Sequence, residues 1–441
     1  MRTVTRTSIF TLLILTVVLP FAGADESLTL QKARSLTLSR SATLRQAGLA
    51  VDAASLAAQA QGYAALPNIS ASAGGSYDYS LSTTRPSSPS ASAQVSASWT
   101  LFDGGRTSDL VRKFGFATQA ARETLRSTRV SLVGQADAAF FAVQAADASV
   151  EAASSDLDAA KLRQGIAQAK IDAGILSKSA FLQTEAETAG YETTLIVARK
   201  NLGSARLRLA SLTGTPTATT LEKIDFSSYD DLLVRLSALD EVAIDKLASD
   251  LGALATANSP SLTLSSLSRE QAKMAVAIAK KSYLPTVAAG FSQGLSYSAT
   301  VGPGYPGSIS LSASMSVDPW AKRNAVDAAS VAVAQADLAA NQGETDLALN
   351  VAQALYGWLA SAGSIRSSAK ALDYASSNYE NVLERFRLSS ATSSDLSTAV
   401  ALVSADTTAL ITSRYGFLSN LSTLCGLVGL EDETRLMQLV R

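Results

Sequence analysis

The sequence contains no histidine and a single cysteine, Cys425, among its 441 residues. Without histidine the commonest general base, the Ser-His catalytic pair and most transition-metal sites are excluded. One cysteine can form neither an intrachain disulfide nor a cysteine-rich metal cluster. No glycine-rich phosphate loop of the Walker or Rossmann type is present. The sequence therefore predicts a protein that is not an enzyme and that uses no cofactor or metal.

Excess charge and long hydrophobic runs are also missing. The formal net charge is −1 and no basic stripe occurs, so nucleic acid is not expected as a partner. Beyond the N-terminus no stretch of about 18 apolar residues appears, which predicts that no helix spans a membrane.

The N-terminus has the pattern of a secretory signal peptide. Arg2 and Arg6 precede an apolar run from Ile9 to Val18, and the small residues Ala22 to Ala24 follow. We therefore expect residues 1–24 to be removed on export, with Asp25 as the mature start.

Four short segments alternate apolar and small polar residues, and they come in two pairs. They begin near Asn68, Ala91, Thr286 and Ser308, and the fourth alternates to Val317. A period of two places each set on one side of a strand. One apolar face and one serine-rich face over about ten residues is typical of a transmembrane β-barrel around a wet lumen.

The alternative is an antiparallel sheet with one face on a core and the other in water. Charge favours the barrel, because residues 284–317 contain no Asp, Glu, Lys or Arg, and a solvated sheet face normally carries charges. Aromatic residues near the strand ends suit girdles at the lipid headgroups. The girdle residues we predict are Tyr79, Trp99, Tyr297 and Trp320.

The chain is a tandem repeat. The segment from Tyr63 to Pro67 corresponds to the segment from Lys281 to Pro285, which lies 218 residues later in the chain. Asp103 corresponds to Asp318, which lies 215 residues later. After each strand pair comes a long alanine-rich helical stretch without proline, with apolar residues every seven positions. The matching heptad residues are Ala136, Val143, Val150 and Leu157 in the first half, and Val351, Trp358, Ile365 and Leu372 in the second.

Each long helix is expected to end in a turn and return antiparallel. The first turn contains Gly174, and the returning helix is capped by Ser177 or Ser179; in the second turn the cap is Ser393 or Ser394. A further helix is expected from about Asp240 to Ser282.

The predicted fold is mainly α with a small β part, built from two repeats of a strand hairpin followed by long antiparallel helices. The first repeat covers 25–212, with a β-hairpin at about 66–102 and a helical hairpin at about 108–212; a connector or equatorial segment covers 213–240. The second repeat covers 241–424, with a β-hairpin at about 284–317 and a helical hairpin at about 321–424; a C-terminal tail covers 425–441.

Four strands cannot close a membrane barrel, whose smallest known forms have eight, and an open edge in lipid leaves backbone groups unpaired. A closed barrel therefore requires strands from several copies of the chain, and three copies would supply twelve.

The order of these features resembles the TolC-like outer membrane factors, the exit ducts of tripartite efflux pumps and type I secretion systems. The resemblance covers nearly the whole mature chain. It rests on residues at the junctions of strands and helices, and on the two helical turns. The junction residues are Pro67, Asp103, Gly104, Gly105, Pro285 and Asp318.

The resemblance implies an outer membrane homotrimer with most of the chain in the periplasm. Its twelve-stranded β-barrel would continue into a periplasmic α-helical barrel, and its partners would be a periplasmic adaptor (membrane fusion) protein, an inner membrane transporter and outer membrane lipid. It also implies a periplasmic aperture lined by aspartates, for which Asp395 occupies the matching position; an acid at a helix start is the plainer interpretation of that residue. The other aperture residues we predict are Ser394, Gly174, Ser179, Arg385 and Arg387, and the two arginines could pair with carboxylates such as Asp172.

Two functions remain open from the sequence. The first is a passive exit channel for efflux or type I secretion. The alternative is a secreted alanine-rich coiled-coil surface filament or adhesin without channel activity, which would explain the helices and the signal peptide but not the two serine-lined strand pairs.

Overall fold

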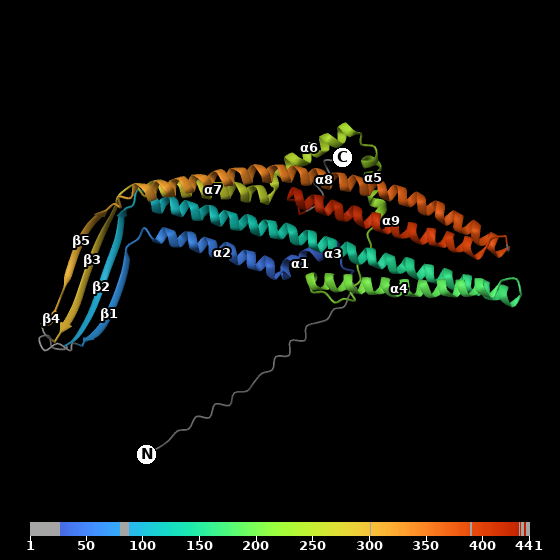
Figure 1. Ribbon diagram of the computed structural model, residues 1–441, viewed down its shortest axis with the longest axis horizontal. Helices are drawn as coiled ribbons and strands as arrows, with labels where there is room; N and C mark the ends of the chain where they lie inside the picture. The colour runs from blue at the N-terminus through green and yellow to red at the C-terminus, as the bar shows by residue number, and fades with distance from the viewer. Residues whose placement is uncertain are drawn as a thin grey trace, which may run out of the picture.

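The computed structural model describes residues 27–79, 88–299, 301–388, 390–431, 433 and 436–437. The predicted signal peptide, residues 1–24, lies outside the described residues. A small sheet occupies one end of an elongated molecule, and two long helical hairpins run from it to the opposite end (Figure 1).

The elements repeat in the same order in the two halves of the chain. The first half contains α1 (Leu30–Arg40), α2 (Ala42–Tyr63), β1 (Asn68–Asp78), β2 (Ser88–Phe102), α3 (Arg106–Asp172) and α4 (Lys178–Thr213). The connector forms the 3-10 turn η1 (Phe226–Tyr229) and α5 (Asp230–Ser237), and α6 (Glu241–Asn258) and α7 (Pro260–Lys281) follow. The second half continues with β3 (Thr286–Ser298), β4 (Gly302–Gly304), β5 (Gly307–Ser314), α8 (Pro319–Arg387) and α9 (Ser393–Val428).

The single helix expected from about Asp240 to Ser282 is wrong, because the chain breaks at Ser259. Pro260 has no N–H to give to a continuing helix and instead occupies the first position of α7. The first half has the same break at Ser41, whose side chain caps α2 by accepting from the N–H of Leu44 at 3.1 Å. Ser41 and Ser259 are themselves 218 positions apart in the sequence, so the break belongs to the repeat.

All strand pairs of the sheet are antiparallel. The order is β1-β2-β3, and both the short β4 and the longer β5 pair with the other side of β3. The register joins apolar residues across the strands: Ala97 is opposite Phe291, and Phe291 is opposite Ile309. A one-residue slip would move every such side chain to the other face.

The fourth strand is shorter than its alternation predicts. Ser314, the last residue of β5, lies opposite Thr286, the first residue of β3. Within the ranges that the structure describes, Met315 and Val317 therefore have no strand residue of the same chain beside them, and they lie outside β5.

The offsets of 218 and 215 differ by three positions, of which the hairpin loops account for two and a bulge in β2 for one. The equivalent pairs Asn68↔Ser98 and Thr286↔Ser314 give offsets of 218 for the first strands (68 to 286) and 216 for the second (98 to 314). The register shifts between Thr100 and Phe102, so that one extra residue enters β2 and reduces the offset to 215 at Asp103.

Six of the eight heptad residues identified in the sequence are buried in the helical part, and the other two, Val150 and Leu372, are partly buried against its core. Ala136, Val143 and Leu157 are buried in the first half, as are Val351, Trp358 and Ile365 in the second. The largest core cluster lies about halfway along the rod, where the connector crosses the bundle. There Trp358 stacks on Phe417 with ring centroids 5.6 Å apart.

Candidate functional site

The sheet has two unlike faces. On one face serine hydroxyls pair across the strands, Ser70 with Ser96 at 2.8 Å and Ser292 with Ser308 at 2.9 Å. The opposite face carries exposed apolar side chains, including Ile309, 87% of whose surface is accessible. Within the five strands the only charged residue is Asp78, at the end of β1. An apolar face of this kind suits hydrocarbon, and a hydroxyl-lined face suits water.

The two outer strands of the sheet leave backbone groups unpaired within the described part of the chain. β1 pairs only with β2, and β5 pairs only with β3. In hydrocarbon each unpaired N–H or C=O costs several kcal/mol. The sheet is therefore incomplete as a membrane structure in a single chain.

The junction between sheet and helices is held by Asp103, which lies directly after β2. Its carboxylate accepts hydrogen bonds from the N–H groups of Gly105 at 2.9 Å and Thr107 at 2.7 Å, and from the Thr107 hydroxyl. Burial opposes ionisation of Asp103, but the hydrogen bonds from Thr107, Gly105 and Arg106 outweigh it and lower the pKa. The turn needs its two glycines, since Gly104 and Gly105 have φ of 70° and 80°.

An ion pair that the sequence did not suggest closes the same junction. Lys281, at the end of α7, lies 2.6 Å from the carboxylate of buried Asp109 in α3 and also donates to the carbonyl of Gly105 at 3.0 Å. Trp99 ties β2 to the end of α2 by donating to the carbonyl of Ala65 at 2.8 Å.

The remaining junction residues mark element boundaries. Pro67 lies in the turn between α2 and β1, and Pro285 comes directly before β3. Asp318 caps α8 by accepting from the N–H of Ala321 at 3.1 Å.

The predicted girdle residues lie at the two ends of the sheet. Trp99 and Trp320 are at the end that meets the helices, Trp320 in the first turn of α8 rather than on a strand. Tyr79 follows β1 and Tyr297 lies near the end of β3, at the far end of the sheet. All four side chains are exposed, so they remain candidates for contact with lipid headgroups.

At the opposite end of the molecule, the first helical turn is built around Gly174. Its φ of 72° ends α3, and the carbonyl of Lys170 accepts from the N–H groups of Ile175 and Leu176. Ser177 caps α4, as one of the two predicted candidates, and its hydroxyl lies 3.0 Å from that of Ser179.

In the second turn the cap is Thr392, so the predicted caps Ser393 and Ser394 are wrong; both lie in the first turn of α9. Thr392 and Asp395 form a reciprocal capping box. The Thr392 hydroxyl accepts from the N–H of Asp395 at 3.1 Å, and the Asp395 carboxylate accepts from the N–H of Thr392 at 2.9 Å. These hydrogen bonds from Thr392, together with the charge of Arg385, lower the pKa of the exposed Asp395 carboxyl.

The arginines before the second turn do not pair with Asp172. Arg385 donates to the carbonyl of Ser390 at 3.3 Å, and Arg387 lies 2.6 Å from Glu384 one turn earlier. Asp172 instead accepts from Gln168 at 2.8 Å. Each of these three charged side chains therefore has a partner within its own helix or turn. A partner so close in the sequence can be reached without bringing two helices together.

The two turns are joined by a contact between their helices. The ammonium of Lys170 in α3 lies 4.1 Å from the ring centroid of Phe386 in α8 and also donates to the Phe386 carbonyl. Beside this contact is a groove of about 380 Å³ lined by both turns, with Ile175 and Leu176 on one side and Thr392 and Ser394 on the other. We call it the tip groove.

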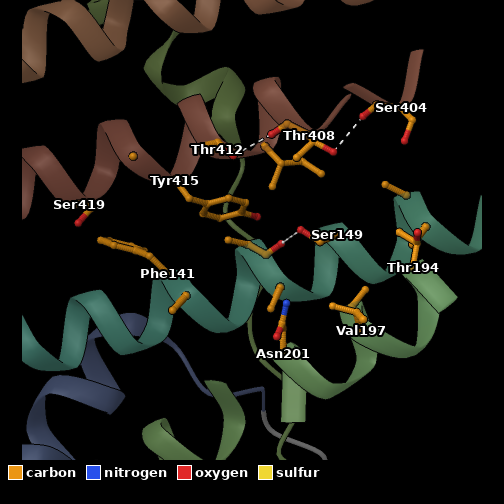
Figure 2. Close-up of a pocket in the computed structure, with 18 of the residues that line it drawn as sticks. Phe141, Ser149, Thr194, Val197, Asn201, Ser404, Thr408, Thr412, Tyr415 and Ser419 are labelled. Atoms are coloured by element: carbon orange, nitrogen blue, oxygen red, sulfur yellow. Dashed lines mark hydrogen bonds between the residues drawn. The ribbon is translucent and has the colours of Figure 1, made fainter. Parts of the chain in front are cut away.

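A second groove, of about 660 Å³, runs between the two helical hairpins nearer the middle of the rod. Figure 2 shows Ser149 of α3 facing Thr408, Thr412 and Tyr415 of α9 across it. Thr408 and Thr412 donate their hydroxyls to carbonyls one turn earlier in α9, at 2.9 and 2.8 Å. Because these hydroxyls are used within the helix, the wall offers mainly apolar contact.

Two further features concern metal binding and membrane-spanning helices. Among the described ranges no three acidic or cysteine side chains converge to hold a metal ion. Among the same residues α9 alone is long and apolar enough to cross a membrane by length and composition. α9 packs along both α8 and α3 in the helical part of the molecule, well away from the sheet (Figure 1).

Comparison with solved structures identifies the same architecture in outer membrane channels. CusC aligns with a TM-score of 0.77 at 15% identity, covering 91% of this chain and 92% of that one. The CmeC outer membrane channel of Campylobacter jejuni aligns with a TM-score of 0.75 at 14% identity, covering 93% and 88%. The open state of the MtrE outer membrane channel of Neisseria gonorrhoeae aligns with a TM-score of 0.72 at 18% identity, covering 91% and 89%.

These alignments confirm the fold class predicted from the sequence, a tandem repeat of strand hairpins and long antiparallel helices. No curated protein sequence matches the chain significantly. The family model for outer membrane efflux proteins matches residues 33–215 and 251–430, most of both repeats, and the chain is therefore an outer membrane protein that belongs to this family.

Proposed function

We propose that three copies of the chain form the outer membrane exit duct of a tripartite efflux pump or a type I secretion system. The observation that carries the proposal is the open sheet, with a hydroxyl-lined face, an exposed apolar face and two unpaired edges. The four long strands β1, β2, β3 and β5 of three copies give twelve, enough to close a barrel with cyclic symmetry. Membership of the efflux family favours this duct over a secreted filament or adhesin.

The duct is passive. Substrates pass along its water-filled bore, and an inner membrane transporter supplies the energy. A periplasmic adaptor docks at the helical turns, where the tip groove offers apolar side chains from both hairpins, including Ile175 and Leu176. The protein performs no covalent chemistry, in keeping with a sequence that has no histidine.

The helical turns form the periplasmic aperture. Threefold symmetry brings three Asp395 carboxylates around the axis, where they favour cations and repel one another when the opening narrows. Ser394, Gly174 and Ser179 shape the two turns, and Arg385 and Arg387 flank the second. The pKa of the Asp395 carboxyl in a single chain lies below its ordinary value of 3.8, and the group is therefore ionised at neutral pH.

Membrane extraction combined with single-channel recording tests the proposal. The protein should require detergent for release, have the mass of a trimer in that detergent, and give long-lived conductance steps in planar bilayers. A filament protein would be released by high salt or urea as water-soluble material and would give no conductance. That second outcome would reject the duct.

A further inference from the structure

A groove of about 410 Å³ lies between α7 and α8 of one chain, which run side by side up to the sheet (Figure 1). Two lysines and three apolar residues line it, together with one serine of α8. The lining residues are Lys273, Val276, Ala277, Lys280, Ser330 and Val333. Both lysines are exposed, whereas the three apolar residues are half-buried and form the floor. We call it the junction groove.

The junction groove begins directly below the sheet. Lys280 is the last residue but one of α7, and β3 begins six residues later at Thr286. Lys273 lies seven residues earlier in the helix, about 10 Å further from the sheet. The apolar face ends with the strands, and the headgroup region of a bilayer extends about 5–8 Å beyond the hydrocarbon on each side. The groove therefore starts at the level of the phospholipid headgroups in the periplasmic leaflet.

Exposed aromatic residues accompany the groove at this level. On α8, Trp320, Arg323, Asp327 and Ser330 follow one another at spacings of three and four, so they share one side of the helix. The predicted girdle residue Trp320 is 79% exposed. Amphipathic rings of this kind lie among lipid headgroups. The α8 wall of the groove thus continues the side of the helix that Trp320 presents to the membrane boundary.

The positive charge of the groove is only partly neutralised by the chain itself. Among the described residues, the ion pairs at this end of α7 involve Lys281 with Asp109, and Lys273 with Glu270, but not Lys280. The pair of Lys273 joins two exposed side chains one turn apart in the same helix, so it is weak and easily exchanged for another anion. The Ser330 hydroxyl donates to the carbonyl of Val326 at 2.9 Å, which leaves the two ammonium groups as the donors of the groove.

The internal repeat shows that helix packing does not require these lysines. In the first half α2 packs on α3 as α7 packs on α8 in the second. The positions that correspond to the two lysines and to the α8 residues of the groove are all uncharged. They are Ser55 and Gly62 in α2, and Gly115 and Thr118 in α3. The lysines therefore give one of two equivalent seams a chemistry that the other lacks.

We propose that the junction groove binds the headgroup of an anionic phospholipid from the periplasmic leaflet of the outer membrane. Lys273 and Lys280 attract the phosphodiester, and the apolar floor displaces water from beside it, which strengthens that attraction. A headgroup with its own ammonium brings a second cation next to the lysines, so phosphatidylglycerol fits better than phosphatidylcholine. The proposal concerns the surface of one chain and depends on neither the cargo nor the aperture.

Native mass spectrometry of the detergent-solubilised protein, titrated with lipid, tests the proposal. The probes are dioleoylphosphatidylglycerol and dioleoylphosphatidylcholine, which have the same acyl chains. Each lysine close to an anionic lipid strengthens binding about five-fold. Lys273→Gln combined with Lys280→Gln should therefore weaken binding of the phosphatidylglycerol about 25-fold and leave binding of the phosphatidylcholine unchanged. Both lysines are exposed, so the variant should fold like the parent.

Three further variants separate the groove from general charge. Lys200→Gln with Lys246→Gln removes two charges from exposed positions in α4 and α6, and should keep the affinity of the parent. Lys280→Arg retains the charge and should also bind like the parent. Ser330→Glu keeps both lysines but adds a carboxylate to the groove, and should weaken binding of phosphatidylglycerol without affecting phosphatidylcholine.

Equal affinity of the parent for the two lipids would overturn the proposal, as would an unchanged preference in the double groove variant. An equal loss in the variant of Lys200 and Lys246 would assign the preference to overall charge and reject the groove. Glycerol 1-phosphate is the soluble comparison, since it carries a phosphate ester without acyl chains. It should not displace the lipid at the same concentration, and displacement would show that the groove takes a soluble phosphate ester instead.

Discussion

Lys281 and Asp109, at the junction of sheet and helices, form an ion pair of 2.6 Å between α7 and α3. The Asp109 side chain is nearly inaccessible, and that of Lys281 is about two-thirds covered. Removing one partner would leave a charge without compensation, whereas removing both would not. The pair therefore fixes the first turn of α3, in the first repeat, against the end of α7, in the second repeat.

Lys281→Met should destabilise the protein by about 2 kcal/mol, below the usual cost of breaking a buried pair because the lysine retains some contact with water. Urea unfolding in detergent, followed by far-ultraviolet circular dichroism, measures the change. The double variant Lys281→Met with Asp109→Leu should recover most of the loss. Lys273→Met is the matched control, since its exposed pair with Glu270 one turn away should contribute no more than about 0.5 kcal/mol. Equal losses in the single and double variants would contradict the assignment.

Gly104→Ala should strongly lower the free energy of unfolding. Gly104 has a φ of 70°, and a Cβ there would lie 2.5 Å from Cδ1 of Leu284. Backbone strain alone costs about 1–2 kcal/mol, and the contact adds to it. The midpoint of urea unfolding should fall, and the yield of trimer in the outer membrane should fall with it.

Gly115→Ala provides the control for that substitution. Gly115 lies within α3, and no heavy atom approaches within 4 Å of the added Cβ. In a helix interior, alanine stabilises the helix by about 1 kcal/mol relative to glycine. This variant should therefore be at least as stable as the parent protein. A loss of stability at Gly115 equal to that at Gly104 would show that the turn conformation is not the cause.

Local periodicity made most of the fold predictable. The period of two in the strands, the heptads of α3 and α8, and the repeat of Leu-Pro before β1 and β3 each depend on neighbours in the sequence. The break at Pro260 is equally visible in the sequence, because a proline cannot continue a helix, although the helical pattern persists on both sides of it.

Contacts between distant segments could not be predicted in this way. Lys281 and Asp109 belong to different repeats, and their equivalents Tyr63 and Asn324 carry no charge, so the repeat itself gave no hint of the pair. The prediction of the residue that caps α9 was wrong for a different reason. A run of serine and threonine precedes the helix, each of these residues can cap, and only the backbone geometry selects Thr392.

Asp395 has two roles that can be separated by variants. Asp395→Ala removes both the aperture charge and the capping box, whereas Thr392→Ala removes the hydroxyl of the box and keeps the carboxylate. If the carboxylate ring controls the aperture, Asp395→Ala should raise conductance in planar bilayers and weaken block by multivalent cations. Thr392→Ala should leave cation block nearly unchanged. Equal effects of the two variants would assign Asp395 to the helix cap alone.

The pH dependence of cation block follows from the direction of the pKa shift. The folded pKa of Asp395 lies below its ordinary value of 3.8, so the carboxylate is charged at every pH above that value. In the open aperture, where the three carboxylates are well separated, block should therefore be constant from neutral pH down to about pH 5 and should be lost only as the pH falls through the depressed folded pKa. In the narrowed aperture their mutual repulsion opposes the depression of the pKa, and block should be lost at a higher pH than in the open one. The stabilising effect of the capping box is lost as the pH falls through the depressed pKa. A decline of block in the open aperture already complete by pH 5 would indicate that another group is responsible.

The contact between Lys170 and Phe386 links the two hairpins at the tips and should resist their separation. Lys170→Met keeps the length of the side chain but removes the charge above the ring and the hydrogen bond to the Phe386 carbonyl. An interaction of this kind contributes about 1 kcal/mol, which corresponds to a roughly five-fold change in the equilibrium between joined and separated tips. We expect more frequent opening events in single-channel recordings, together with faster proteolytic cleavage in the first turn near Gly174. Lys178→Met, on an exposed residue at the start of α4, controls for the loss of a positive charge near the turns. Because the two substitutions remove the same charge, an equal rise in opening frequency would assign the effect to general electrostatics, and only a rise confined to Lys170→Met identifies the contact with Phe386 as the link.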